Sequence, residues 1–434
     1  MTFLDRINQN YFNNGLSPEV LLLLDPINRE RIEVQNWVER MSRQMKNQRF
    51  RAQDFNELKA WVVGSIVTNL LPGAWRGYVP PITLKGRHAA IDDYMESNRW
   101  KRLSAGDHLL DLGCGFPPHT TIDTAKRFPG VHIKGADPSF GRYQVKDTND
   151  DYACFDHEIE LLYFQPGSNE PERWEALFKD AEATKEHFRR HLIPVLQSLP
   201  GKEDELGTAE HGGFTVIENP VLEYTRPNLE FDQRGIGSSN LGNFQVARCF
   251  NVLCYFNRDF REETLAWMPG VLDEGGIFLT GMNWTRSRHA RYAVYRKENG
   301  KMIPREFAFS IENVRPLEIV AWFALHDDDY CTAAVAELVG TIRDDEDFCS
   351  SIDQRMDELL VRAGFKPRSE NGYLGGLSET ADPSTLDTVA ELVGKALERE
   401  GYAQKAAEVL NNAGYNAWVN CIGHVAVDPK DLNI

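Results

Sequence analysis

The sequence predicts an α/β fold built on a parallel sheet, with a helical region before it. Residues 107–137 pass from a short apolar run through two glycines and a helical segment into a second short apolar run. Short, fully apolar runs are typical of strands that are covered on both faces of a parallel sheet. The alternation of strand and helix returns in residues 229–284, whereas residues 1–105 show the one-sided apolar spacing of amphipathic helices.

Several helices are expected within residues 1–105. Ser17-Pro18 suits a helix start, because serine caps the first turn and proline fits its first position. Residues 54–71 predict a further helix, and the Pro- and Gly-rich stretch 72–87 interrupts the pattern.

Two segments interrupt the α/β alternation. Residues 151–228 predict a β-hairpin followed by a long helix, which Pro194 bends near its end. Residues 286–345 begin with a second hairpin, around a Glu-Asn-Gly turn. We expect both segments to be insertions that cap the main domain, which comprises residues 106–150 and 229–434.

The C-terminal part is predicted to complete the main domain. Residues 388–414 carry apolar side chains at helical spacing and predict one long helix. Residues 416–427 alternate between apolar and polar side chains, which is typical of an antiparallel strand that closes a sheet.

The charge balance is acidic. With 65 Asp and Glu against 48 Lys and Arg, the formal net charge is −17, which disfavours nucleic acid as a partner. The most basic stretch, residues 286–297, is interpreted as a solvated face. The acidic stretch 326–329 is interpreted as a solvated loop and not as a metal site, because consecutive loop residues point in different directions.

The seven cysteines lack paired spacing, so neither a zinc knuckle nor a redox pair is predicted. Cys114, Cys249 and Cys254 lie in apolar runs and are predicted to be buried thiols. The N-terminus shows no secretory signal, and no apolar run is long enough to span a membrane. We therefore expect a cytoplasmic protein with no membrane partner.

A glycine hinge follows the first strand of the predicted sheet. Gly113 and Gly115 allow a tight turn and a close approach of a ligand to the backbone. A dinucleotide site would carry a third glycine, but Phe-Pro-Pro occupies residues 116–118, which disfavours a pyrophosphate. Asp111 before the hinge suits a cation, and Asp137 after the second strand suits the hydroxyls of a ribose. S-adenosylmethionine, a cationic amino acid joined to adenosine, matches both.

These segments resemble the class I S-adenosylmethionine-dependent methyltransferases. "DLGCG" (111–115) is similar to their first motif and "GADPS" (135–139) to their second. Residues 229–281 follow the order of their third strand, fourth strand, helix and fifth strand, and "LLVRAGFKP" (359–367) resembles a late helix-to-strand step. Around 248–281 there is a local likeness to the chemotaxis-receptor glutamate methyltransferases. The resemblance implies a Rossmann-like, seven-stranded sheet with helices on both faces, and S-adenosylmethionine as the cofactor.

The resemblance also implies which residues bind the cofactor. The family often has an acid after its third strand, and here backbone atoms near Gly235 and Ile236 would contact the adenine instead. The implied cofactor-binding residues are Asp111, Gly113, Cys114, Gly115, Asp137, Pro138, Ser139, Gly235, Ile236 and Phe250.

Candidate catalytic residues are Asn251, Tyr255 and His119. Asn251 and Tyr255 follow the fourth strand, where ligands bind in parallel sheets, and a histidine suits a general base. The alternatives are a turn for Asn251, core packing for Phe250 and a helix start for His119. Two further pairs are weaker candidates for the acceptor pocket and for the cofactor's carboxylate: His289 with Tyr292, and Arg76 with Tyr78.

The sequence therefore predicts methyl transfer to a small or medium-sized acceptor in an enclosed pocket. One alternative is methylation of a protein carboxylate, and another is a protein that binds S-adenosylmethionine without methylating. The sequence is compatible with a homodimer. It identifies neither the acceptor nor the atom that is methylated.

Overall fold

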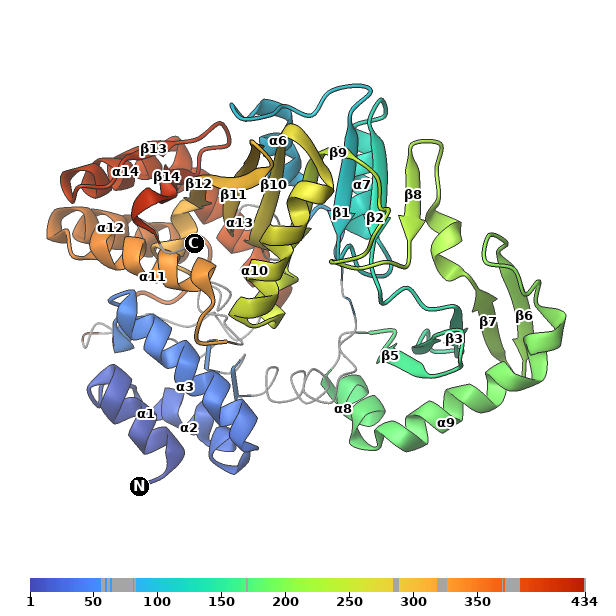
Figure 1. Cartoon of the computed structure of the whole chain (residues 1–434). Coiled ribbons are helices and arrows are strands. Elements are labelled where there is room, and N and C mark those ends of the chain that lie inside the picture. Colours follow the sequence, from blue (N-terminus) through green and yellow to red (C-terminus); the bar gives the residue numbers. More distant parts are fainter. Residues whose placement is uncertain are drawn as a thin grey trace. The chain divides into compact units, whose positions relative to one another are not determined.

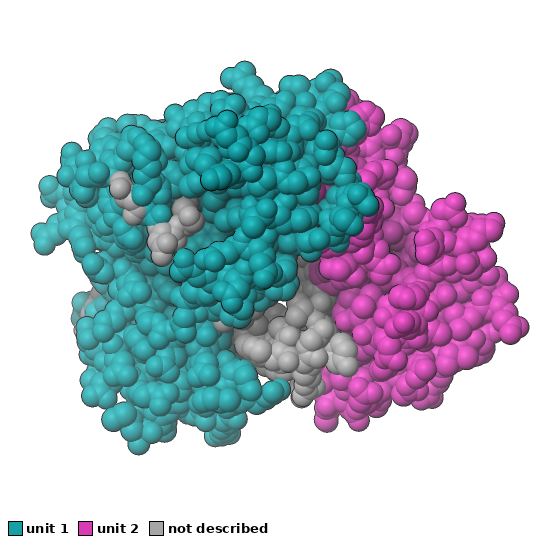
Figure 2. All heavy atoms as spheres, viewed as in Figure 1, with its two compact units in different colours: residues 1–64, 86–109, 236–434 teal, residues 65–85, 110–235 magenta. Residues whose placement is uncertain are grey.

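The computed structural model describes residues 1–55, 59–60, 63–64, 81, 83–168, 171–283, 289–317, 326–368, 370 and 383–432. The chain forms two compact units (Figure 2). Unit 1 comprises residues 1–64, 86–109 and 236–434, and unit 2 comprises residues 65–85 and 110–235. The division falls inside strand β1, between Leu109 and Leu110.

The main sheet is mixed, in the order β13-β14-β12-β11-β10-β9-β1-β2-β8. β2 pairs with β8 and β9 pairs with β10 in parallel, as expected for an α/β fold. The strands are β1 (His108–Leu112), β2 (His132–Ala136), β8 (Leu229–Asp232), β9 (Phe244–Phe250), β10 (Leu272–Asn283), β11 (Ala290–Glu298), β12 (Lys301–Phe309), β13 (Ala417–Val419) and β14 (Val425–Val427).

The expected count of seven strands is wrong, because two later segments extend the sheet at its edge. The hairpin expected in the second insertion forms, but β11 pairs antiparallel with β10 from Ile277↔Arg296 to Asn283↔Ala290. It is therefore part of the main sheet and not a cap. Residues 416–427 form a hairpin, β13–β14, and not the single strand predicted. β14 pairs with β12 and so satisfies the open edge that β12 would otherwise present.

Unit 2 contains a second, antiparallel sheet in the order β5-β4-β3-β7-β6. The predicted hairpin is confirmed as β4 and β5, but the sheet also includes β3, which begins before residue 151. The predicted long helix is interrupted at Asp180, whose side chain caps α9, and Pro194 lies in the 3-10 turn after α9. The elements are β3 (Tyr143–Lys146), β4 (Tyr152–Phe155), β5 (Leu161–Gln165), α8 (Pro171–Lys179), α9 (Ala181–Leu192), β6 (Gly207–His211) and β7 (Phe214–Glu218).

The core of this second sheet is aromatic and aliphatic. Phe155, Phe164, Phe188 and Leu192 are buried together, and α9 packs against β3, β4 and β7. Burial of side chains of this size is the main stabilising contribution to such a layer. The sheet and its helix thus form a layer with a core of its own inside unit 2.

Within unit 1, α10 and α11 pack against strands of the main sheet, and α3 packs against α11 (Figure 1). Ser17 caps α2 as predicted, because its Oγ accepts a hydrogen bond from Val20 N at 3.2 Å and Pro18 begins the helix. Most of the helix predicted at 54–71 lies outside the described residues. The helices are α1 (Phe3–Phe12), α2 (Pro18–Leu24), α3 (Ile32–Asn47), α6 (Ala89–Ser97), α10 (Arg258–Trp267), α11 (Tyr330–Arg343), α12 (Glu346–Arg362), α13 (Pro383–Arg399) and α14 (Tyr402–Asn412).

The single helix predicted at 388–414 is two helices. Gly401 separates α13 from α14 and adopts φ +77°, a left-handed conformation that interrupts a right-handed helix. After α12, residues 366–368 are irregular, so the described residues show no strand at the predicted helix-to-strand step.

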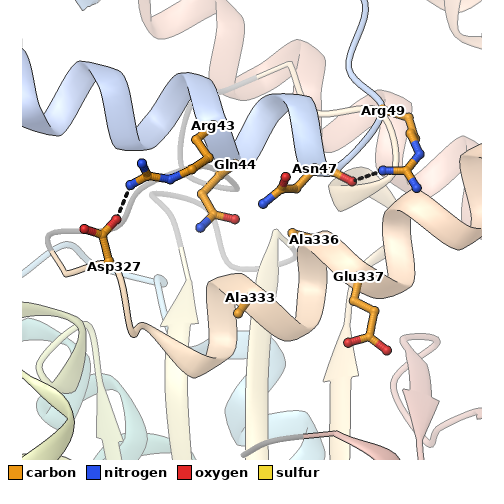
Figure 3. A pocket seen from close by; sticks show the side chains of 8 residues that line it. All are labelled: Arg43, Gln44, Asn47, Arg49, Asp327, Ala333, Ala336 and Glu337. Carbon is orange, nitrogen blue, oxygen red and sulfur yellow. Dashed lines mark hydrogen bonds and ion pairs between the residues drawn. The ribbon is translucent and has the colours of Figure 1, made fainter. Parts of the chain in front are cut away.

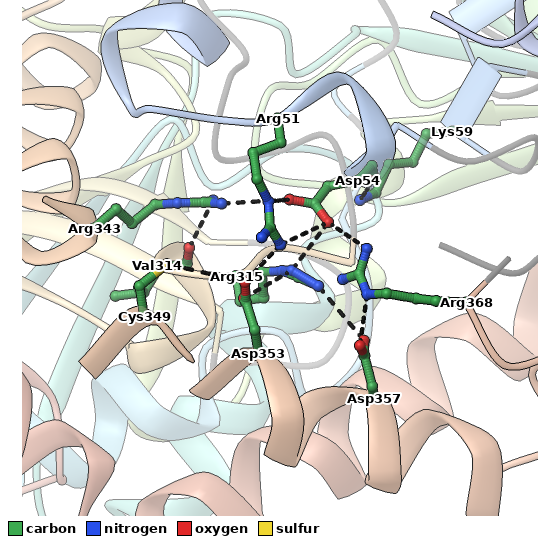
Figure 4. Close-up of polar contacts among 10 residues, drawn as sticks. All are labelled: Arg51, Asp54, Lys59, Val314, Arg315, Arg343, Cys349, Asp353, Asp357 and Arg368. Carbon is green, nitrogen blue, oxygen red and sulfur yellow. Dashed lines mark hydrogen bonds and ion pairs between the residues drawn. The ribbon is translucent and has the colours of Figure 1, made fainter. Parts of the chain in front are cut away.

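A buried ionic cluster holds together several segments of unit 1 (Figure 4). Asp54 is 1% exposed, and its carboxylate lies 3.0 Å from Arg51, 3.2 Å from Arg315, 3.4 Å from Arg343 and 2.9 Å from Arg368. These arginines come from the turn before Asp54, the loop after β12, the end of α11 and the chain after α12. A buried charge is stable only when it is paired, so this cluster links segments far apart in the sequence.

The environment of Asp54 sets its titration. Burial by itself raises the pKa of the Asp54 carboxyl, but Arg315 and Arg51 outweigh burial and lower that pKa to about 2. Because the pKa is lower in the folded than in the unfolded chain, the cluster stabilises the fold above about pH 4. This contribution is lost as the pH falls towards the folded pKa.

Replacing Asp54 by alanine is expected to lower the free energy of unfolding by about 3–5 kcal/mol, because four guanidinium groups lose their shared partner. The urea midpoint of unfolding measures this loss. Asp344→Ala is the matched control, because Asp344 is exposed and pairs with Arg49 at 3.0 Å. It should cost at most about 1 kcal/mol. Equal midpoints for the two variants would contradict a stabilising role for the cluster.

Candidate functional site

The glycine loop follows β1 and has the conformation that the sequence predicts. Gly113 and Gly115 adopt φ +66° and +69°, in the left-handed region that glycine enters at little cost. Gly113 N donates a hydrogen bond to Ala136 O at 2.8 Å, which joins the start of the loop to the end of β2. The loop leads directly into α7 (His119–Arg127).

The carboxylate of Asp137 is bonded to this loop. Its Oδ2 accepts from Gly115 N at 2.7 Å, and its Oδ1 accepts from Ser139 N at 2.8 Å and Ser139 Oγ at 2.5 Å. Asp137 is 5% exposed. Burial raises the pKa of Asp137, and the hydrogen bonds from Ser139 and Gly115 act against that rise. The structure thus brings together three of the predicted cofactor-binding residues.

Asp111, the other acid, is directed at the chain itself. It lies within β1, is 1% exposed, and accepts a hydrogen bond from Thr121 Oγ1 at 2.7 Å. Because Thr121 is in α7, this contact ties the crossover helix to the strand that precedes it. A role for Asp111 towards a cation stays a prediction.

Gly115 is also required by a neighbouring segment of unit 2. A Cβ built at this position would lie 2.5 Å from Pro81 O and 2.4 Å from Thr83 Cγ2. Pro81 O accepts a hydrogen bond from Phe116 N at 3.0 Å, and Thr83 Oγ1 accepts one from His119 N at 3.1 Å. Residues 81 and 83 therefore lie against the glycine loop and contact it through polar atoms.

The Phe-Pro-Pro stretch after the hinge anchors the loop. Phe116 is buried, and its ring lies 6.4 Å from that of Tyr152 and 5.9 Å from that of Tyr224. Cys114 and Cys154 are buried in the same cluster. This aromatic contact explains the departure from the glycine expected in a dinucleotide site, because the side chain attaches the loop to the second sheet.

The ends of β2 and β8 bring together a second predicted pair. Asp137 N donates to Asp232 O at 3.1 Å, so the two strand ends remain adjacent. Beyond them, a Cβ built on Gly235 would lie 3.4 Å from Pro138 Cγ. Pro138 and Gly235 are thus neighbours, as a shared contact with an adenine would require. Ile236 belongs to unit 1.

His119 is the first residue of α7, and the helix-start interpretation of this residue is confirmed. Burial lowers the pKa of His119, and the charge of Lys85 lowers it further. The imidazole is therefore neutral at physiological pH and could accept a proton. Its catalytic role stays a prediction.

In unit 1, the parallel strands β9 and β10 end in a pair of asparagines. Asn251 adopts φ +58°, and its Nδ2 donates to Asn283 Oδ1 at 2.9 Å. Asn283 N donates to Asn251 Oδ1 at 3.0 Å, and Asn283 Nδ2 donates to Arg87 O at 2.6 Å. The turn at Asn251, the alternative to a catalytic role, is confirmed, and the catalytic role stays a prediction. The reciprocal pair fixes the backbone beyond both strands.

Phe250 is 3% exposed and lies beside a histidine that the sequence did not indicate. The rings of Phe250 and His88 are 5.5 Å apart. His88 is buried, and its Nδ1 has no hydrogen-bond partner among the described residues. Burial lowers the pKa of His88 well below its usual value, and Arg248 and Arg87 add to this effect. No local pattern marks His88, because it lies in the N-terminal region, far from β9 in the sequence.

The other acceptor-side candidates differ in exposure. Tyr255 is 41% exposed, and its backbone oxygen accepts a hydrogen bond from His326 Nε2 at 3.0 Å. Tyr292 is fully buried, and its hydroxyl accepts from Asn420 Nδ2 at 2.9 Å. Burial lowers the pKa of His289 to about 4. Arg76 and Tyr78 lie outside the described residues.

Two interpretations of charged stretches need correction. Arg291, in the basic stretch 286–297, is 2% exposed and donates to Thr332 Oγ1 at 2.7 Å, so this part of the stretch is not a solvated face. It is buried because β11 is an inner strand of the main sheet. In the acidic stretch, Asp327 and Asp328 are exposed as expected. Asp329 is buried and caps α11.

A groove of about 560 Å³ lies on unit 1 between α3 and α11 (Figure 3). Arg43 contacts Asp327 across it, and Arg49 Nη1 donates to Asn47 O at 2.9 Å. The lining residues are Arg43, Gln44, Asn47, Arg49, Asp327, Ala333, Ala336 and Glu337. None of the predicted site residues lines this groove, so it is separate from the strand ends.

Within the residues that the structure describes, no three His, Cys, Asp or Glu side chains are grouped as metal ligands would be. None of the helices that the structure describes has both the length and the apolar character needed to cross a bilayer. Cys114, Cys249 and Cys254 are buried thiols, as predicted.

No family model and no curated protein matches the chain. Among solved structures, the chain is similar to PKMT2 from Rickettsia typhi in complex with AdoHcy, with 13% sequence identity and a TM-score of 0.22 over 46% of this chain and 26% of that one. Another structure of PKMT2 from Rickettsia typhi matches with 12% identity and a TM-score of 0.22, over 78% and 44%. The chain thus spans less than half the length of these proteins. TM-scores this low do not identify a function for the chain.

Replacing Gly115 by alanine is expected to destabilise unit 2, because a left-handed φ costs about 1–2 kcal/mol and the Pro81 carbonyl must move as well. Gly201→Ala is the matched control in the same unit, since Gly201 has φ +71° with no atom within 4 Å of its Cβ position. Thermal unfolding should show a larger drop in Tm for Gly115→Ala. Equal drops would mean that Pro81 does not constrain the loop.

Proposed function

We propose that this protein is an S-adenosylmethionine-dependent methyltransferase that acts on a small or medium-sized acceptor. The observation that carries the proposal is the hydrogen bond between Gly115 N and the carboxylate of Asp137. It places the acid that follows β2 directly against Gly115, in the loop that follows the neighbouring strand β1. Ligands of open α/β sheets bind at these carboxyl ends.

The residues of unit 2 are assigned to the nucleoside. Asp137 accepts hydrogen bonds from the ribose, and the backbone near Gly113 and Gly115 faces the amino acid part of the ligand. Pro138 and Gly235, which are neighbours, flank the adenine. Cys114 and Ser139 complete this part of the site. The buried Phe116 holds the loop in position and carries no ligand contact of its own.

The residues of unit 1 are assigned by the family resemblance. Ile236 and Phe250 belong to the cofactor side, and Asn251 and Tyr255 to the acceptor side. The reciprocal bonds of Asn251 with Asn283 support a positioning role, because they hold the end of β9 rigid. When bound, S-adenosylmethionine supplies an electrophilic methyl group, so the chain itself has to align the acceptor and exclude water. His119, neutral at physiological pH, accepts a proton where the acceptor must lose one.

A protein that binds S-adenosylmethionine without methylating is the second candidate. One observation favours it. The Asp137 carboxylate already accepts three hydrogen bonds from the chain, and residues 81 and 83 lie against the glycine loop. These contacts within the chain order the loop by themselves, and this order does not depend on a catalytic reaction. Methylation of a protein carboxylate has only the local sequence likeness in its favour.

Replacing Asp137 by alanine should weaken binding of S-adenosylhomocysteine at least tenfold in calorimetric titration, because the ribose loses a charged acceptor. Asp156→Ala is the control. Asp156 also accepts from turn amides, at 2.9 and 2.8 Å, but these amides belong to Glu158 and Glu160 in the turn between β4 and β5. Unchanged affinity in Asp137→Ala, or no binding by the wild-type protein, would defeat the proposal. Circular dichroism of both variants verifies that the chain remains folded.

Transfer of labelled methyl groups distinguishes the acceptor classes. With methyl-labelled S-adenosylmethionine and a pool of small metabolites, label is expected in the small-molecule fraction. Label found only in protein, and released by mild base as methanol, would identify a carboxyl ester and overturn the small-acceptor assignment. Tight cofactor binding with no transfer to either fraction would favour the second candidate.

A further inference from the structure

The acid assigned to the ribose is already occupied by the chain itself. A carboxylate accepts about four hydrogen bonds, and Asp137 accepts three, from Gly115 N, Ser139 N and Ser139 Oγ. Because Asp137 is only 5% exposed, little of the carboxylate is open to a new donor. A ribose that donates from both of its hydroxyls would bring the total to five, so one internal donor has to leave.

The three internal donors differ in how easily they can leave. Gly115 N and Ser139 N are backbone groups, and their positions are set by the glycine loop and by the end of β2. Ser139 Oγ is the exception, because rotation about one side-chain bond removes it from Oδ1 without moving the backbone. Ser139 is only half-buried, so a displaced hydroxyl finds water as its new partner.

We infer that Ser139 sets the affinity of the site for ribose-containing ligands by competing for Asp137. In the structure its hydroxyl donates to Oδ1, and on binding a ribose hydroxyl replaces it. This inference rests on the proposed function and deepens it. It assigns Ser139 a role opposite to that of an ordinary ligand-binding serine, whose loss weakens binding.

The experiment compares Ser139→Ala with Ser139→Thr, which keeps the hydroxyl. S-adenosylhomocysteine is the main probe, and adenosine and 2′,3′-dideoxyadenosine form a matched pair with and without the diol. Ser139→Ala should bind S-adenosylhomocysteine and adenosine roughly three- to tenfold more tightly than wild type, the value of one net hydrogen bond. Ser139→Thr, which keeps the competing hydroxyl, should show a smaller gain than Ser139→Ala. Dideoxyadenosine should show no gain, because it has no hydroxyl to exchange.

The outcomes separate this inference from the proposed function. If wild type binds S-adenosylhomocysteine and Ser139→Ala binds it equally or more weakly, the competition is wrong and the cofactor assignment stands. An equal gain for dideoxyadenosine would also overturn the competition, because the gain would not depend on the diol. If neither wild type nor Ser139→Ala binds any of the three probes, both proposals fail. Thermal unfolding without ligand verifies that Ser139→Ala folds.

Discussion

Asp137 Oδ2 accepts a hydrogen bond from Gly115 N, and the geometry of the candidate site depends on this contact. The physical constraint is general, since a carboxylate removed from water needs donors around it. Here one donor is Gly115 N, in the loop after β1. The other two are Ser139 N and Ser139 Oγ, beyond the end of β2. The same carboxylate thus fixes the position of the bend at Gly115, a residue that has no side chain of its own. Phe116 completes the arrangement, because its buried ring attaches the far side of the loop to the second sheet.

This design has a functional consequence. Under the proposed function, the hydrogen bonds that order the loop also occupy the acceptors that a nucleoside would need, so binding would be an exchange and not a simple addition. When one hydrogen bond replaces an equivalent one, the free energy of binding changes little. The affinity is then decided by small differences between the donor that leaves and the donor that replaces it. A loop that the chain itself holds by hydrogen bonds would not lose the entropy of folding when a ligand binds.

The ionic cluster around Asp54 follows the same constraint in unit 1. Four guanidinium groups from separate segments converge on one carboxylate that is 1% exposed. The asparagine pair at the ends of β9 and β10 is a neutral counterpart, in which two amides satisfy each other and the backbone around them. In each case, polar groups fix the places where regular secondary structure ends.

The local sequence was sufficient to predict several elements of both units. Strand-like apolar runs, the two glycines and the Ser17-Pro18 start are short-range signals, and the structure has β1, α7, β2 and α2 where they predict them. It also predicted the buried cysteines, and it gave a turn as one of two interpretations of Asn251. These features depend on the conformational preferences and solubility of neighbouring residues, which one sequence contains in full.

Tertiary structure decided what depends on distant partners. Whether the hairpin β11–β12 caps the fold or joins the sheet depends on which edge is open, and its sequence alternates in either case. The partners of Asp111 and Asp137, the burial of Arg291 and the position of His88 beside Phe250 are likewise set by segments remote in the chain. The sequence by itself determined where the chain could turn and which acids followed its strands. Only packing decided which donors those acids would bind, because hydrogen-bond partners in a folded core are chosen by proximity in space and not by spacing along the chain.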